Sequence, residues 1–99
     1  MTYRLEIRPD ALTDIEQAAR WYEERESGLG IKFAREILET IDSLSLSPHY
    51  RIRHKRRNIR WKILSKFPYR VVFQMKDDLI TVIAVIHSAR HDRNWRARL

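Results

Sequence analysis

The chain has 99 residues, of which 43% are hydrophobic and 33% are charged, and it contains no cysteine. This composition is typical of a folded, water-soluble protein, and it excludes disulfides, thiol chemistry and cysteine-based zinc sites. No apolar run of about 18 residues is present, so we expect no membrane-spanning helix. We expect one domain over residues 1–99 and, because the first residues lack the apolar core of a signal peptide, a cytoplasmic location.

The net charge of +7 is unevenly distributed along the chain. Residues 1–50 contain 6 Lys or Arg against 10 Asp or Glu, whereas residues 51–99 contain 14 against 3. The resulting charge of +11 on the C-terminal half favours an anionic partner, either nucleic acid or an acidic protein segment. The alternative is a basic surface that is only solvated, because net charge reports on association and not on function.

The N-terminal part of the chain predicts a strand followed by a helix. Residues 2–8 alternate apolar and charged side chains, as a strand buried on one face does. Asp10, or the capping-box spacing that begins at Thr13, predicts the start of the helix. Apolar residues then recur at helical spacing and form one stripe: Ile15, Ala18, Ala19 and Tyr22.

Both glycines of the chain fall between this helix and a second one. Gly28 is the expected left-handed residue at the end of the first helix, and the second helix is predicted from about residue 31 to 44. Two helices joined by a short turn form an antiparallel hairpin. The apolar face of the second helix is expected to contain Phe33, Ile37, Leu38, Ile41 and Leu44. Three aromatic residues on or beside the apolar stripes are assigned to the core, namely Trp21, Tyr22 and Phe33.

The C-terminal half predicts three strands after a basic connector at residues 48–58. The strands are expected at residues 59–64, 69–76 and 79–88, and the last is almost wholly apolar, as a strand buried on both faces should be. The order β-α-α-β-β-β predicts an α+β fold with an N-terminal strand, an antiparallel helical hairpin and a three-stranded antiparallel meander. The helices are expected to pack on one face of a small twisted sheet. The conformation of residues 89–99 stays open.

Basic side chains near the end of the last strand are the candidates for a catalytic site. In a meander the start of one strand lies beside the end of the next, so we expect Arg70 and His87 to be close, with Arg90 just beyond them. Guanidinium groups hold phosphate or carboxylate, and an imidazole transfers protons near neutral pH, so an RNA-cleaving enzyme would use these residues. The alternative is that His87 only hydrogen-bonds the strand ends at the rim of the sheet.

A second candidate site is a basic surface that contacts a target or nucleic acid through phosphate groups. Its alternative is a solvated face, and the scarcity of aromatic residues in the basic run argues against a platform for stacked bases. The histidines lack the spacing of a metal site and no nucleotide-binding or hydrolase motif is present, so we expect no metal and no cofactor. The candidates are Arg51, Arg53, Lys55, Arg56, Arg57, Arg60 and Arg93.

An ordered set of segments gives the chain a family resemblance over about residues 3–95: DIEQAARWYEE, GLGIKFAREI, SLSLSP, FPYRVVF, ITVIAVIH and SARHDRNW. The set resembles the RelE/ParE superfamily of toxins from bacterial type II toxin–antitoxin systems, and above all its ParE-like, plasmid stabilisation branch. The resemblance implies a protein that arrests growth when it is free. It also implies a small antitoxin, encoded beside the toxin, whose C-terminal segment wraps the toxin and neutralises it.

The resemblance implies two alternative activities. ParE toxins poison DNA gyrase, whereas RelE toxins are ribosome-dependent mRNA endoribonucleases with basic residues on the sheet and a tyrosine or histidine near the C-terminus. Arg70, His87 and Arg90 match positions where the endoribonucleases keep such residues. No tyrosine follows Tyr69, however, and the helical hairpin is long, as in ParE. A non-enzymatic gyrase poison is therefore favoured, an endoribonuclease is the alternative, and an inactive basic binding module is the third hypothesis.

The expected partners follow from the same resemblance. The antitoxin would present an acidic or amphipathic C-terminal segment, which covers the basic half of the toxin or adds a strand to an open edge of its sheet. DNA gyrase or the ribosome is the expected target, and no membrane is involved. A homodimer and a mixed toxin–antitoxin assembly are both compatible with a chain of this length.

Overall fold

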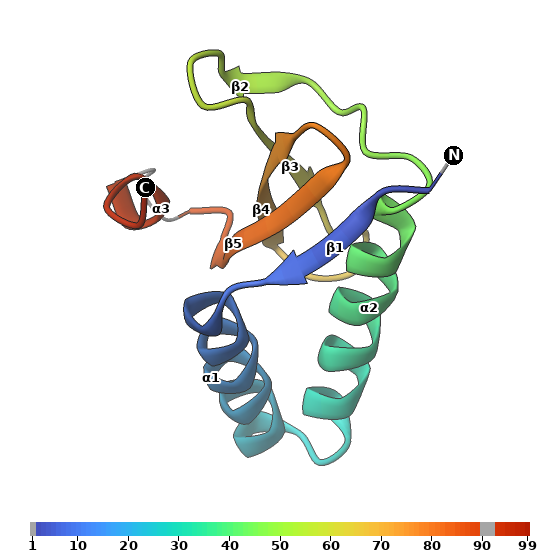
Figure 1. Ribbon diagram of the computed structural model, residues 1–99. Helices are drawn as coiled ribbons and strands as arrows, with labels where there is room; N and C mark the ends of the chain where they lie inside the picture. Colours follow the sequence, from blue (N-terminus) through green and yellow to red (C-terminus); the bar gives the residue numbers. More distant parts are fainter. Residues whose placement is uncertain (1, 90–92) are drawn as a thin grey trace.

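The computed structural model describes residues 2–89 and 93–99. Figure 1 shows α1 and α2 running side by side as a hairpin, joined by a tight turn. Five strands form one sheet in the order β1-β5-β4-β3-β2. The predicted α+β class, helical hairpin and antiparallel meander, here β3-β4-β5, are confirmed. In chain order the elements are β1 (Arg4–Ile7), α1 (Pro9–Arg25), α2 (Leu29–Leu44), β2 (Ile52–His54), β3 (Ile59–Ile63), β4 (Tyr69–Lys76), β5 (Leu79–His87) and α3 (Arg93–Arg96).

The structure contains a strand that the sequence did not predict. β2 lies inside the segment expected to be a connector, residues 48–58, and it pairs antiparallel with β3, with an irregular register between Ile52 and His54. The opposite edge of the sheet is β1, which pairs in parallel with β5. The basic segment is therefore part of the sheet and forms one of its two edges.

α1 begins before both of the predicted capping residues. Pro9 is its first residue and Arg8 is the N-cap, so the predictions that Asp10 or Thr13 caps the helix were wrong. Proline suits the first position of a helix, because its φ is already helical and the missing N–H would have no partner there. No helix in the part of the chain described by the structure is long and apolar enough to cross a membrane.

The turn between the helices depends on both glycines. Gly28 has the predicted left-handed conformation, with φ of 89°, although Glu26 is the C-cap of α1 and Gly28 is the N-cap of α2. The Glu23 carboxylate accepts hydrogen bonds from the backbone N–H groups of Gly28 (2.8 Å) and Gly30 (3.0 Å), so α1 supplies the cap of α2. A Cβ atom at Gly30 would lie 2.4 Å from the carbonyl oxygen of Ala19. The two helices can therefore approach this closely only with glycine at that position.

Two apolar clusters cover the two faces of the sheet. The larger lies between the sheet and the helices and contains Phe33 and Phe73, whereas the smaller lies on the opposite face and contains Trp95. β5 contributes to both clusters, as predicted, and a register irregularity in its pairing with β4 places Ile83 and Ala84 together in the smaller cluster. The sheet is therefore buried on both sides along β5.

The helical spacing assigned two residues to the core that the structure leaves exposed. Trp21 and Leu38 are each 48% exposed, so their core assignments were wrong. Tyr22 and Phe33 are in the core as predicted, with ring centres 5.2 Å apart. Trp21 thus lies just outside the apolar stripe of α1, where a partner or ligand can reach it.

Candidate functional site

The pairing of β4 with β5 determines where the predicted catalytic residues point. Tyr69 pairs with His87 across the ladder, and Arg70 pairs with Ile86. The rings of Tyr69 and His87 are 5.2 Å apart, on the side of the sheet that the helices cover. Because successive side chains alternate between faces, Arg70 lies on the other face, where its guanidinium carbon is 4.7 Å from the ring centre of Trp61.

The expected convergence of Arg70 and His87 on one anion is therefore not formed. The two strand ends are adjacent, as predicted, but the side chains project from opposite faces of the sheet. Arg70 is only 6% exposed, and its Nη1 donates a hydrogen bond to the Ser88 carbonyl oxygen at 3.2 Å. Arg90, the third predicted member, lies outside the described residues.

The hydrogen bonding of His87 fixes which ring nitrogen carries the proton. Its Nδ1 accepts a hydrogen bond from the backbone N–H of Ala89 at 3.1 Å. A neutral imidazole that accepts at Nδ1 carries its proton on Nε2. In this arrangement the neutral ring presents its Nε2–H as a hydrogen-bond donor, and its Nδ1 lone pair is already used. A general base needs a free lone pair to accept a proton.

A groove of about 1110 Å³ lies between α1, the end of β5 and the C-terminal residues. Aromatic side chains of Trp21, Tyr22 and Tyr69 line it, together with His87. The Arg25 guanidinium carbon is 3.6 Å from the centre of the Trp21 ring, a cation–π contact at the surface. Burial raises the pKa of the Tyr22 hydroxyl above its ordinary value. The sequence did not predict this groove, because it is built by segments from both ends of the chain.

One end of the groove is formed by an ion pair between Asp14 of α1 and Arg98. The Arg98 Nη1 is 2.6 Å from the Asp14 carboxylate, and the hydrogen bond raises the pKa of the guanidinium. Asp14 also accepts from the backbone N–H of Val85 at 3.0 Å, and Arg98 donates to the Ile83 carbonyl oxygen at 3.1 Å. Arg8 in turn donates to the Arg98 carbonyl oxygen at 2.7 Å. These bonds hold the C-terminal residues against α1 and β5.

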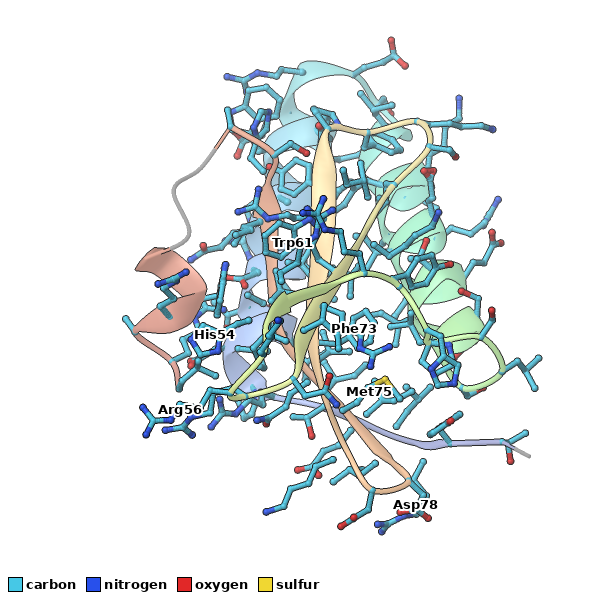
Figure 2. The ribbon with its side chains drawn as sticks, turned by 90° about the horizontal axis from the view of Figure 1, so that it is seen from above. His54, Arg56, Trp61, Phe73, Met75 and Asp78 are labelled. Atoms are coloured by element: carbon cyan, nitrogen blue, oxygen red, sulfur yellow. The ribbon has the colours of Figure 1, made fainter. Side chains whose placement is uncertain are left out.

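The face of the sheet opposite the helices carries arginines stacked on tryptophan. The Arg53 guanidinium carbon is 4.6 Å from the ring centre of Trp61, which Arg70 also contacts. Trp95 is fully buried, with its ring centre 6.3 Å from that of Trp61 and 6.2 Å from that of His54. Figure 2 labels His54 and Trp61 on this part of the sheet. It also shows the side chain of Arg56 extending away from the loop that joins β2 to β3.

Most of the predicted basic surface is gathered at β2 and the loop that follows it. Arg60 is the exception: it is half-buried, and it donates to the Asn58 side chain at 3.2 Å and to the Tyr50 carbonyl oxygen at 3.3 Å. The backbone of Arg93 opens α3, and its side chain is not among those described. Among the described residues, no group of three potential metal ligands occurs. Five predicted cations are exposed and form no ion pair in the described structure: Arg51, Arg53, Lys55, Arg56 and Arg57.

Comparison with solved structures shows the same fold in two kinds of toxin. The chain superposes on the chromosomal ParDE toxin–antitoxin system from P. aeruginosa with a TM-score of 0.74 and 17% identity, covering 87% of this chain and 96% of that one. For a doubly substituted E. coli RelE toxin in the free state, the TM-score is 0.71 at 18% identity, covering 99% and 94%. For the RelE–RelB complex of Pyrococcus horikoshii, it is 0.51 at 18% identity, covering 92% and 100%.

Sequence comparison identifies the family to which the chain belongs. No curated protein sequence matches the chain significantly. Residues 5–92, however, match the family described as the ParE toxin of the type II toxin–antitoxin system parDE. That match spans nearly all of the strands and both long helices. The chain therefore belongs to the ParE toxin family of type II toxin–antitoxin systems.

Proposed function

We propose that this toxin acts in the cytoplasm by binding DNA gyrase, and that it performs no catalysis of its own. The observation that carries the proposal is the position of Arg70 and His87 on opposite faces of the sheet. Cleavage of RNA requires an acid–base group and a cation that act on the same phosphate. A toxin that works by docking needs no such convergence. The ParE toxin family, whose model matches residues 5–92, is the branch that the resemblance associates with gyrase.

The arrangement of His87 supports the same proposal. Its Nδ1 already accepts the N–H of Ala89, so the neutral ring is set up as a donor. In a docking surface this donor would bind an acceptor of the target, beside the aromatic side chains of the groove. Under this proposal, His87 contributes to recognition and stability only.

A RelE-like ribosome-dependent endoribonuclease is the second candidate function. The feature that favours it is the set of exposed cations around β2, which suits the backbone of a nucleic acid. In that case His87 would be the general acid or base, and Arg70 and Arg90 would stabilise the charge of the phosphate transition state. Removing an acid–base catalyst lowers a cleavage rate by about 10²–10⁴-fold.

Inducible expression in a bacterial host tests the proposal, with DNA and protein synthesis followed separately by pulse labelling. We expect DNA synthesis to fall first and cells to filament, and we expect His87→Ala to retain growth arrest. If protein synthesis falls first and His87→Ala abolishes the arrest, the endoribonuclease replaces the gyrase poison. If neither synthesis falls, the inactive basic binding module is the remaining hypothesis. The folding of His87→Ala is checked by its thermal unfolding.

We also propose that an antitoxin with an acidic segment neutralises the protein. The exposed cations around β2, which form no ion pair with a carboxylate of the described residues, support an acidic partner. Growth arrest that disappears when such an antitoxin is co-expressed would agree with this proposal, and arrest that persists would contradict it.

A further inference from the structure

The loop that joins β2 to β3, residues 55–58, presents cations from a backbone that is tied to β4. The Gln74 side-chain amide donates to the carbonyl oxygen of Arg57 at 3.0 Å, and the Asn58 amide donates to that of Met75 at 3.1 Å. The Met75 N–H in turn donates to the Asn58 carbonyl oxygen at 3.2 Å. Asn58 has a φ of 53°, in the left-handed region that asparagine adopts more readily than most residues. These bonds give the loop a defined conformation.

A recess of about 310 Å³ lies between this loop and the end of β4. Arg56, Arg57 and Lys76 contribute three cations to its lining, and Asn58 and Gln74 contribute two amide groups. The three cationic residues are exposed, and none forms an ion pair with a carboxylate of the described residues. Lys76 was not among the candidates that the sequence suggested. Several N–H donors on neighbouring cations suit the oxygen atoms of a phosphate group.

The recess belongs to the basic face of a molecule whose other face is acidic. Phe73 packs against the helices, so its neighbours on β4 at alternate positions, Gln74 and Lys76, project from the opposite face. Arg53 lies over Trp61 on that same face. The two long helices, which cover the other face, together contain eight Asp or Glu and four Lys or Arg. A polyanion is therefore attracted to the basic face and repelled by the helices.

The aromatic rings on the basic face favour a duplex over a single strand. A site for single-stranded nucleic acid needs open rings on which bases can stack. Here the guanidinium groups of Arg53 and Arg70 lie at the Trp61 ring, and Trp95 is fully buried. The phosphates of a duplex are reached without such rings. B-form DNA also has a major groove that admits a two-stranded β-ribbon, whereas the major groove of A-form RNA is too narrow for side chains to read.

We propose that this basic face binds duplex DNA, with one phosphate group held in the recess between Arg56, Arg57 and Lys76. The cations beside the loop, Arg51 and Arg53, contact neighbouring phosphates of the same duplex. Phosphate contacts carry no information about the bases, so the binding does not depend on base sequence. The DNA site does not rest on the proposed function, because it uses a surface that needs no gyrase.

The salt dependence of binding to a short labelled DNA duplex tests this assignment. Fluorescence anisotropy measures the Kd of the full chain at several salt concentrations, and log Kd should rise linearly with log salt, by about 0.9 for each phosphate contacted. The double variant Arg56→Ala/Arg57→Ala removes two such contacts. Its slope should be lower by about 2, and its affinity should be lower by about tenfold or more. No binding at low salt, or a slope that the double variant leaves unchanged, would overturn the proposal.

A matched double variant separates a local contact from general attraction. Arg20→Ala/Arg35→Ala removes the same charge from exposed positions of α1 and α2, and it should leave the slope unchanged. Equal losses in the two double variants would contradict the proposal, as would tighter binding of a single strand or of an RNA duplex of the same sequence. Thermal unfolding checks that both variants are folded. Inhibition of gyrase is a separate measurement: DNA binding without it removes the proposed function and leaves the DNA site intact.

Discussion

Asp14 and Arg98, 84 residues apart in the chain, form a hydrogen-bonded ion pair that continues the edge of β5 beyond the end of β1. β1 pairs with β5 only as far as Val82. Past that point, the Asp14 carboxylate accepts the N–H of Val85 and the Arg98 guanidinium donates to the carbonyl oxygen of Ile83. Two side chains thus satisfy backbone groups that would otherwise face the groove unpaired.

Arg98→Ala should destabilise the protein by about 2 kcal/mol, because it leaves a carboxylate with little access to water and no cationic partner. The side chains of Asp14 and Arg98 are 14% and 23% exposed, so solvent screens this pair less than a surface pair. Arg96→Ala is the matched control, since Arg96 is exposed in the same segment. Urea unfolding measures both variants, and equal stabilities would contradict the role given to the pair.

Gly30→Ala should destabilise the helical hairpin by about 2 kcal/mol, a typical cost of overpacking. The added methyl would collide with the backbone carbonyl of Ala19, which cannot rotate away as a side-chain end does. At Gly28 nothing lies within 4 Å of an added Cβ, so only the left-handed backbone opposes substitution there, and Gly28→Asn should be well tolerated. If thermal unfolding ranks the two variants in the opposite order, the close approach of the helices at Gly30 is wrong.

Replacement of Trp95 tests whether the C-terminal helix is part of the core. Trp95→Ala should cost about 3–5 kcal/mol, as removal of a large buried aromatic does, because Trp95 is fully buried against the smaller cluster. Trp95→Phe should cost much less, since the indole Nε1 has no hydrogen-bond partner in the described structure and no bond is lost. Chemical unfolding of both variants is the measurement, and an unaffected Trp95→Ala protein would show that the segment is dispensable.

The stability of the protein should fall above pH 10 in a way that depends on Tyr22. Burial raises the pKa of its hydroxyl in the folded state from the ordinary value of 10.0. Folding therefore favours the neutral phenol. The contribution of this preference to the free energy of unfolding is complete below pH 10 and is lost as the pH rises through the folded pKa. Tyr22→Phe retains the ring and should show a smaller decline in unfolding midpoint between pH 9 and 11. An identical decline in both proteins would remove Tyr22 as its cause.

The parts of the fold that local sequence determines were predicted well. Alternation placed β4 and a continuous apolar run placed β5, both almost to the residue, and the spacing of apolar residues gave both long helices. β2 was missed because its three residues include one apolar side chain, Ile52, within a basic run. Its strand conformation comes from pairing with β3, which is a non-local interaction that no local pattern encodes.

The candidate site was predicted only in part, for a related reason. The prediction that the two strand ends are adjacent was correct. The face of the sheet from which a side chain projects depends on the register of the strands, however, and a shift of one residue moves the side chain to the opposite face. Tyr69, not Arg70, is the residue opposite His87, which separates the two predicted partners. The groove beside Trp21 could not be found from spacing either, because Asp14 and Arg98 come from opposite ends of the chain.

The proposed function is action on gyrase without cleavage of RNA. The most direct test is the supercoiling of relaxed plasmid by purified gyrase at increasing concentrations of this protein, alongside the His87→Ala variant. The proposed function predicts that the wild-type protein inhibits supercoiling and that His87→Ala still inhibits it, at a higher concentration, because His87 contributes to recognition and not to catalysis. Full supercoiling at a large molar excess of the wild-type protein would contradict it.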